Sequence, residues 1–344
     1  MRFIARRLGF YVIAGWFALT LNFLIPRALP GNAVESMMAK YPNLPPSAIA
    51  VLDKDFGVTC HAHLVDGLRQ LSCSNGGQGS LLQQYFVYLG HMLHLNFGLS
   101  VDFYPTTVAS TLHTTLPWTL GLVGTATILS FIIGTGLGIL AGWRRGGRFD
   151  QAMPGFSFLQ AMPYFFLAEL LLLLLANTWH LFPASGGSTL GTTAGFNWPF
   201  INSVLDHSVL PAFTIIITSM AGWMLQMRNV MITTIGEDYV LAAQAKGLST
   251  RRIMFTYAAR NAILPNIAGF ALAIGFVVAG AIVMEIVFSY PGVGYQVLAA
   301  VTSDDIPTMQ GIFLAISFAV LLACLLADVV YVIADPRTRT RAAY

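Results

Sequence analysis

Six long apolar stretches decide what this chain can fold into. Each is long enough to cross the hydrocarbon core of a bilayer, about 30 Å thick, which takes roughly 20 residues of helix. They are Leu8–Leu29, Leu116–Trp143, Met153–Thr178, Val209–Met231, Ile263–Phe288 and Thr308–Ala334. Only 10% of the 344 residues are charged and 56% are hydrophobic, whereas roughly a quarter of the residues in soluble domains are charged. The sequence therefore predicts an all-α polytopic membrane protein with six transmembrane helices.

Lysine and arginine indicate which way the chain crosses the membrane. If both termini lie in the cytoplasm, 14 of the 18 Lys and Arg residues fall in cytoplasmic segments. These are Arg2, Arg6, Arg7, Arg144, Arg145, Arg148, Arg228, Lys246, Arg251, Arg252, Arg260, Arg337, Arg339 and Arg341. The other four, Arg27, Lys40, Lys54 and Arg69, lie in one long outer segment. Because positive charge collects in cytoplasmic loops, we expect both termini inside the cell.

The chain then divides into four parts. Residues 1–29 form an N-terminal transmembrane helix, 30–115 an extracytoplasmic segment with amphipathic helices, 116–334 the transmembrane core, and 335–344 a cytoplasmic tail. The first residues also have the charge and the apolar run of a secretory signal. Because the run is longer than a signal core and lacks a small-residue cleavage site before Pro26, we expect a retained helix, with cleavage as the alternative.

Two helices are expected in the outer segment. Gln83–Leu95 places apolar residues at helical spacing, which suits a helix on the membrane surface or against the spans. Val108–Leu116 is a similar approach to the second span, and Pro117 is expected to end it.

The second stretch is dense in glycine, at Gly121, Gly124, Gly134, Gly136, Gly138 and Gly142. Helices in lipid associate by close packing, so glycines mark places where two backbones approach each other. We therefore expect a tight seam within the bundle, and a kink lining a pore is the alternative.

A polar segment, 236–265, separates the fourth and fifth stretches. Glu237 to Lys246 has an acidic first turn and a basic last residue, as a short helix prefers. Gly247 is expected to end that helix, Ser249 to cap a second one, and Pro265 to close the second. A short helix on a rigid two-helix bracket outside the bilayer is what a membrane protein needs if a soluble partner is to move it.

A second distinctive block, Ser289, Tyr290, Pro291, Gly292 and Gly294, follows the fifth stretch. The proline and the two glycines predict a tight re-entrant turn. We expect Gly292 and Gly294 to adopt backbone conformations that other residues resist.

Two cysteines, Cys60 and Cys73, lie in the outer segment, where an oxidising environment favours a disulfide. Free thiols are the alternative. His61 and His63 beside Cys60 suggest zinc ligands, but the spacing fits no four-ligand site, so no metal is expected. Cys324 is interpreted as a packing residue in the last span.

Two carboxylates, Glu169 and Glu285, lie in or near apolar stretches, where an unpaired charge is costly. Each is either part of a translocation path or a hydrogen-bonded structural acid. For Glu285, which adjoins the glycine turn, we favour the structural role; for Glu169 both interpretations stand. Asp328 in the last span is expected to cap or pair near the inner interface.

No catalytic set is present in the sequence. It contains no phosphate-binding loop, no His-Glu-x-x-His helix and no nucleophile elbow. We expect neither an enzyme nor a cofactor in this chain, and we interpret the basic loops as orientation signals rather than nucleic-acid sites.

Several blocks together resemble the dipeptide/oligopeptide class of ABC importer permeases, in particular its first-subunit type. They are Arg6-Arg7-Leu8 with Pro30-Gly31, Leu89–Ser100, Leu116–Leu120, the loop from Asp238 to Ile263-Leu264-Pro265, Glu285 with Phe288–Gly294, and Ala327-Asp328 with Tyr331 and Asp335-Pro336-Arg337. Two features depart from the class: Leu241 stands where the loop often has an acid, and an apparent insertion covers 58–80.

The resemblance implies a type I ABC importer permease fold in a prokaryotic cell membrane, with a cytoplasmic coupling helix between spans 4 and 5. The residues that match the motif of the family's loop are Ala242, Ala243, Gly247, Ile263, Leu264 and Pro265, and the ATPase-coupling loop is assigned to Ala242, Ala243, Lys246, Gly247, Leu248, Ser249, Arg251 and Arg252. It also implies a second homologous permease subunit, two ATPase subunits that bind ATP and Mg, and an extracytoplasmic solute-binding protein. A bulky charge at Ala243 or Gly247 is then expected to uncouple transport without preventing membrane insertion.

The implied function is peptide import by alternating access, with oligosaccharides or nickel chelates as alternative solutes. An ion-coupled secondary transporter is the alternative from a different class, and it would use intramembrane charges and broken helices in repeated halves. The sequence contains no convincing internal repeat. A membrane-embedded hydrolase is less favoured still, because no nucleophile–base pair is present.

Overall fold

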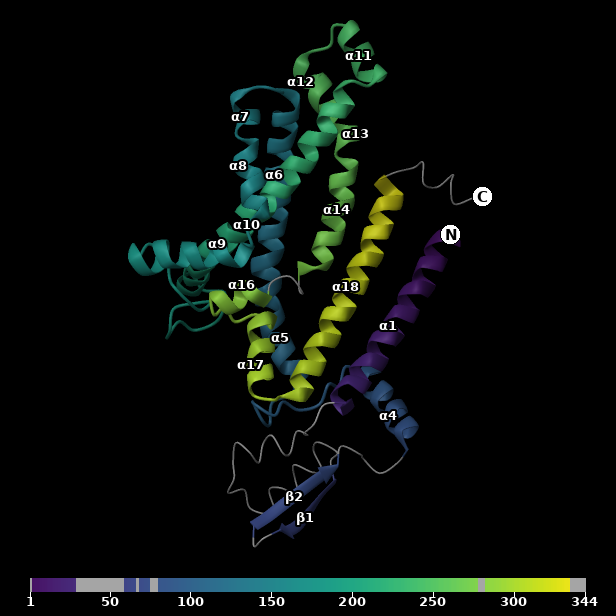
Figure 1. Cartoon of the computed structure of the whole chain (residues 1–344), viewed down its shortest axis with the longest axis vertical. Coiled ribbons are helices and arrows are strands. Elements are labelled where there is room, and N and C mark those ends of the chain that lie inside the picture. The colour runs from purple at the N-terminus through teal and green to yellow at the C-terminus, as the bar shows by residue number, and fades with distance from the viewer. Residues whose placement is uncertain (1, 29–58, 66–67, 75–79, 278–281, 335–344) are drawn as a thin grey trace.

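The computed structural model describes residues 2–28, 59–65, 68–74, 80–277 and 282–334 (Figure 1). This part of the chain is helical, as the sequence predicts, except for one antiparallel hairpin of β1 (Thr59–Val65) and β2 (Leu68–Ser74). The hairpin belongs to the outer segment and lies at the end of the molecule opposite α11 (Asp238–Ala245). The all-α prediction is thus correct for the membrane part and missed this small outer sheet.

Four continuous helices among the described residues are long and apolar enough to cross a membrane. They are α1 (Arg2–Ala28), the run of α5 (Val108–Thr119), η1 (Leu120–Gly124) and α6 (Thr125–Trp143), α10 (Trp198–Ile235), and α18 (Ile306–Ala334). The expectation that Pro117 ends the approach helix is wrong. Pro117 lies inside α5, and the helix continues from there into η1. The π-helical turns of η1 follow directly, and such turns can satisfy the carbonyls that a proline leaves without a donor.

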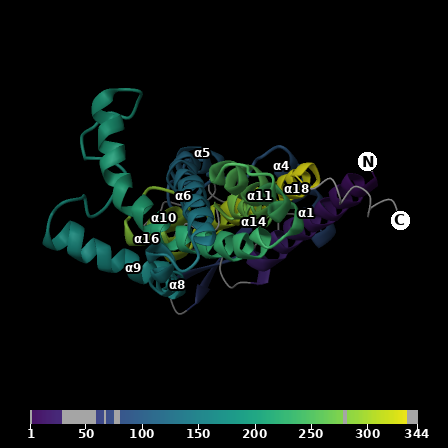
Figure 2. The same cartoon turned by 90° about the horizontal axis from the view of Figure 1, so that it is seen from above.

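The other two predicted spans are not single straight helices. In the third, α7 (Arg148–Gln151) and α8 (Met153–Ala161) are bent by 95° from α9 (Tyr164–Leu171) and η2 (Leu172–Thr178). The bend falls at Met162, whose backbone is extended because Pro163 follows it. Figures 1 and 2 both show α9 projecting away from the other helices.

The fifth stretch is represented by α14 (Leu264–Gly275) and α16 (Ile282–Val287), and 278–281 lie outside the described residues. A short helix, α17 (Val293–Thr302), follows. Six spans therefore remain a prediction, with four continuous helices and one bent pair of sufficient length in the described part of the chain.

The first and last helices pack against each other in opposite directions. The Tyr11 hydroxyl donates a hydrogen bond of 2.7 Å to the Asp328 carboxylate, and the Arg7 guanidinium lies 3.4 Å from the same group. Toward the other end, the Gln310 amide donates to the Asn22 carbonyl at 2.9 Å. Asp328 is paired, as the sequence predicts.

The expected helix on the outer side is α4 (Leu81–Leu93), which begins after Ser80 caps its first turn. It packs against α1: the Tyr85 and Thr20 hydroxyls lie 2.7 Å apart, and the Asn22 amide donates to the Tyr88 hydroxyl at 3.0 Å. The apolar spacing of Gln83–Leu95 therefore indicated a real helix, lying against a span.

Helices α6 and α10 approach each other very closely, and three glycines make this close approach possible. A Cβ added to Gly134, Gly138 or Gly142 would lie 2.5–2.8 Å from atoms of α10. Those atoms belong to Met220, Trp223, Met224, Met227 and Met231. A Cβ at Gly121, Gly124 or Gly136 would meet nothing within 4 Å. The predicted seam is confirmed, but only half of the six glycines form it.

We predict that Gly138→Ala destabilises the protein, because its new methyl group would press on the Met224 carbonyl, 2.6 Å away. Overpacking of this kind costs about 1–3 kcal/mol. Gly136→Ala is the matched control on the same helix, since its methyl group would occupy open space. Thermal unfolding of the purified proteins in detergent measures the difference, and equal midpoints for the two variants would contradict the seam.

Candidate functional site

The short helix predicted at 237–246 is α11, which lies beyond the end of α10 (Figures 1 and 2). Glu237 is its N-cap and Lys246 its C-cap, as the sequence indicates. Gly247 then has a φ of +71°, a left-handed conformation that glycine adopts without strain. Its amide donates to the Gln244 carbonyl at 2.9 Å and closes the helix end.

The second helix of the bracket is built from α12 (Thr250–Arg252), π-helical η3 (Ile253–Ala259) and α13 (Arg260–Ala262). Ser249 is the N-cap of this helix, as predicted, with an extended backbone, although its side chain makes no capping hydrogen bond. The helix ends before Pro265, which lies in the first turn of α14. We use "bracket" for residues 238–262.

The bracket is fixed to the spans by an apolar cluster. Val240 and Ala243 of α11 are buried, with 0% and 3% of their surface exposed. They pack with Met227 and Met231 of α10, Ile139 of α6, and Ile253, Met254, Ala258, Ala259 and Ala262. Because close-packed side chains transmit displacement, these contacts couple α11 to the ends of α6 and α10.

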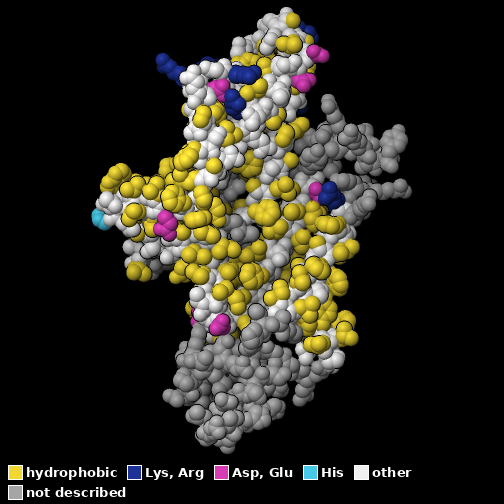
Figure 3. Space-filling model, in the orientation of Figure 1, with side chains coloured by type: hydrophobic (Ala, Val, Ile, Leu, Met, Phe, Trp, Pro, Cys, Tyr) yellow, Lys and Arg dark blue, Asp and Glu magenta, His cyan; other side chains and the backbone are white. Residues whose placement is uncertain are grey.

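The opposite face of α11 is free. Leu241, Ala242, Gln244, Ala245 and Lys246 are exposed, and Leu241 has 49% of its surface accessible. Among the other predicted loop residues, Gly247, Ser249, Arg251 and Arg252 are exposed and Leu248 is half-buried. Figure 3 shows Lys and Arg side chains gathered at this end of the molecule.

The burial of Ala243 changes how the loop must be tested. A bulky charge there would enter the apolar cluster and disturb the bracket itself, because a buried unpaired charge is costly. The expected uncoupling by a charge at Ala243 stays a prediction, and the burial of this residue adds a loss of stability to it. The residues presented outward are its neighbours Ala242 and Ala245.

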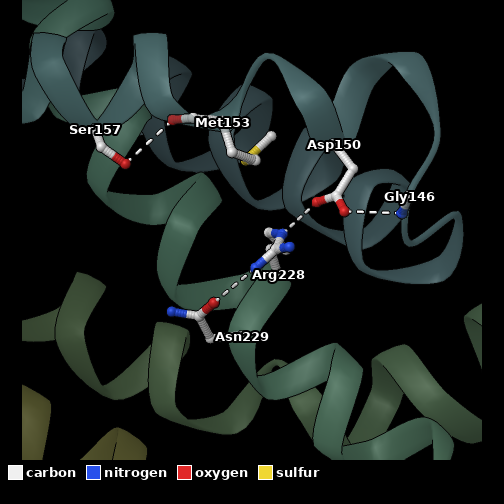
Figure 4. A network of polar contacts seen from close by, with 6 residues as sticks. All are labelled: Gly146, Asp150, Met153, Ser157, Arg228 and Asn229. Atoms are coloured by element: carbon white, nitrogen blue, oxygen red, sulfur yellow. Dashed lines mark hydrogen bonds and ion pairs between the residues drawn. The ribbon is translucent and has the colours of Figure 1, made fainter.

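An ion pair fastens α10 to α7, the short helix that follows the turn after α6 (Figure 4). The Arg228 Nε donates to the Asp150 carboxylate at 2.5 Å, and the second oxygen of that carboxylate accepts from the Gly146 amide at 2.9 Å. The Arg228 Nη1 also donates to the Asn229 amide oxygen at 3.2 Å. The sequence did not predict this pair: Arg228 was counted among the cytoplasmic basic residues, and Asp150 was given no role.

The turn after α16 is organised by Glu285, which is fully buried. Its carboxylate accepts hydrogen bonds from the Thr119 hydroxyl at 2.6 Å, the Gly294 amide at 2.6 Å and the Tyr295 amide at 3.4 Å. Thr119 in turn accepts from the Val293 amide at 2.9 Å. A carboxylate at the N-terminus of α17 satisfies otherwise unpaired amides, so Glu285 has the structural position that we favoured.

The turn glycines are required for space rather than for backbone conformation. Gly292 has a φ of −94°, and neither it nor Gly294 is among the residues with positive φ. A Cβ at Gly292 would overlap the Glu285 carboxylate, and one at Gly294 would overlap the backbone of Ile282. The predicted reason was wrong, and the residue with positive φ in this turn is Ser289, at +47°.

The remaining turn residues pack against other helices. Tyr290 is 2% exposed, and its hydroxyl lies 3.0 Å from that of Ser208 on α10. Its ring stands edge-on to Trp118, with centroids 5.6 Å apart. Pro291 lies against Gly187, where an added Cβ would be 2.7 Å from the proline ring. The turn is therefore part of the packed core.

The other predicted site residues lie apart from the bracket and from the turn after α16. Glu169 is exposed on α9 and lines neither cavity described below. Cys60 and Cys73 are directly opposite in the register of the hairpin, and their disulfide stays a prediction. Cys324 is a free, half-buried cysteine in α18. The described residues contain no group of three or more potential metal ligands.

These features define a multi-pass membrane protein that carries a rigid helical bracket beyond its spans. Residues 134–340 match the model of a family described as the binding-protein-dependent transport system inner membrane component. The chain belongs to this family, and the resemblance found in its motifs is confirmed. Membership makes it a transporter component.

Relatives cover nearly the whole chain. The dipeptide transport system permease protein DppB of Escherichia coli strain K12 is 31% identical, over 98% of this chain and 99% of that protein. The di/tripeptide transport system permease protein DppB of Pseudomonas aeruginosa strain UCBPP-PA14 is 30% identical over the same shares. The oligopeptide transport system permease protein AppB of Bacillus subtilis strain 168 is 33% identical, over 74% of this chain and 79% of that protein.

We predict that Glu285→Gln lowers stability, because one carboxylate oxygen becomes an amide donor that faces donors already present. An unsatisfied buried group costs about 1–3 kcal/mol. Glu169→Gln, the same change at an exposed position, is the control and should leave the unfolding midpoint unchanged. Thermal unfolding in detergent measures both, and a stable Glu285→Gln protein would contradict the structural role.

Proposed function

We propose that this chain is the transmembrane subunit of an ATP-driven importer and that its solutes are short peptides. Family membership supports the transport role, and the printed names of the relatives, which specify dipeptides, di/tripeptides and oligopeptides, support the solute class. In this proposal both termini and the bracket lie in the cytoplasm. The gathering of Lys and Arg at the α11 end supports that orientation (Figure 3).

The proposed assembly contains a second homologous permease subunit, two cytoplasmic ATPase subunits and an extracytoplasmic solute-binding protein. ATP and Mg would be bound by the ATPase subunits, so this chain would need no cofactor of its own. Closure of the ATPases on ATP would push the bracket and turn the spans from inward-open to outward-open. Hydrolysis would return them.

One observation carries the proposal: α11 is rigidly attached on one side and free on the other. Val240 and Ala243 anchor it to α6 and α10. Leu241, Ala242 and Ala245 leave a small apolar surface facing outward. Such a helix fits a groove on a soluble partner, in the manner of other helix-in-groove contacts. The burial of its inner face means that a displacement of the groove reaches the spans without loss in a flexible loop.

We predict that Ala242→Glu abolishes most ATP-driven uptake while the protein still inserts and folds, because the new charge would have to be buried in the groove. The matched control is Ala152→Glu, an exposed alanine outside the bracket. Uptake of labelled dialanine by the reconstituted complex should fall by about tenfold or more in the first variant and stay unchanged in the second.

Two further measurements complete that test. The thermal stability of Ala242→Glu should match the wild type, whereas Ala243→Glu should lose stability because Ala243 is buried. Normal uptake by Ala242→Glu would overturn the coupling role of α11. Uptake that stops when an ion gradient collapses while ATP stays high would instead favour an ion-coupled transporter.

A further inference from the structure

Two cavities lie one after the other along α10. The first has a volume of about 1240 Å³ and is lined by residues of α7, α8 and α10, among them Asp150, Ser157 and Asn229. The second, about 550 Å³, is lined partly by residues of α6, α14 and α16, among them Ser130 and Met284. We call the first the vestibule and the second the chamber. Gln160, Ser219 and Trp223 line both, so the two spaces meet at these three residues.

The vestibule is bordered by a neutral polar stripe. Ser219, Gly222, Gln226 and Asn229 follow one another at intervals of three or four residues and therefore share one face of α10. Three of them, Ser219, Gln226 and Asn229, are exposed. Hydroxyl and amide groups facing lipid tails within a span would lack partners at a cost of several kcal/mol. This face of α10 is therefore suited to water and solute rather than to lipid.

The charged residues of the vestibule neutralise each other. Asp150 and Arg228 both line it, and they are joined by the ion pair shown in Figure 4. What remains for a passing solute is a set of side-chain amides and hydroxyls. Such groups can donate to and accept from the peptide backbone whatever side chains the peptide carries.

Trp223 is held firmly where the cavities meet. Its ring stands edge-on to Phe131, with centroids 5.5 Å apart, and Phe270 stacks on Phe131 at 4.2 Å. Its carbonyl accepts from the Asn266 amide at 3.1 Å. Asn266 and Phe270 belong to α14, which begins directly after the bracket. Through these contacts α14 connects the bracket to Trp223.

We propose that the stripe Ser219, Gln226 and Asn229, with Ser157 and Gln160 of α8, lines the solute route, and that Gln160 and Trp223 form its narrow point. This inference rests on the proposed function, since it assigns the residues along which peptides pass. The route recognises the peptide backbone and is indifferent to side-chain charge. The narrow point separates the chamber from the vestibule and opens when α14 moves.

The lining is tested by cysteine accessibility in the reconstituted full complex. Gln226→Cys and Asn229→Cys should react with a charged maleimide, and saturating dialanine should slow the reaction about tenfold. Phe213→Cys, an exposed apolar position on the same helix, is the control and should not react. Site-resolved mass spectrometry separates this labelling from that of native cysteines. Absence of reaction at 226 and 229 in every nucleotide state, or reaction without protection by dialanine, would overturn the proposal.

The narrow point is tested by Trp223→Ala and Trp223→Phe. Trp223→Ala should raise ATP-independent leakage of dialanine about tenfold, whereas Trp223→Phe, which keeps a ring at the site, should not. Unchanged leakage in a Trp223→Ala protein of normal thermal stability would overturn the narrow point. Should the wild-type complex fail to take up any peptide, the proposed function fails, and the labelling of 226 and 229 without dialanine still reports whether this face is wet.

Discussion

The close approach of α6 and α10 is the contact on which the rest of the structure depends. In lipid, burial from water gives helices no reason to associate, so they must gain contact by fitting tightly. Gly134, Gly138 and Gly142 supply that fit by letting the α10 backbone lie directly against α6. One face of α10 is thereby fixed for several turns. The contact with α6 prevents α10 from rotating about its own axis. The directions in which its other faces point are therefore fixed as well.

Three features take their position from this held helix. The C-terminal end of α10 leads into α11, and Met227 and Met231 belong both to the seam and to the cluster that anchors the bracket. Arg228, between them, reaches Asp150 across the turn after α6. The neutral stripe faces the vestibule on a side of α10 away from the seam. A change in the angle of α10 would therefore alter the bracket, the ion pair and the vestibule together.

The sequence predicted local features best where one residue type has one physical use. Gly247 ended α11 because only a residue without Cβ takes that turn cheaply. The apolar length of the spans and the pairing of Asp328 were also predictable. The features that the sequence did not predict depend on contacts in the tertiary structure. The burial of Ala243, the need for space at Gly292 and the Asp150–Arg228 pair all arise from packing between segments far apart in the chain. Likewise, the sequence shows Pro163 but not the 95° bend that the chain makes there.

Several acidic side chains are held by hydrogen bonds or ion pairs within the chain, which bears on how solutes of different charge could share one path. Glu285 accepts hydrogen bonds from the Thr119 hydroxyl and the Gly294 amide. Asp305 accepts from the hydroxyls of Ser100 and Thr308, and Asp328 accepts from that of Tyr11. Asp150 is neutralised by Arg228. These carboxylates stabilise turns and helix contacts, and the charged residues that line the two cavities, Asp150 and Arg228, are paired with each other. In the proposed importer, a route lined by amides and hydroxyls would bind each peptide weakly and alike, which suits a path that releases what the proposed solute-binding protein has already selected.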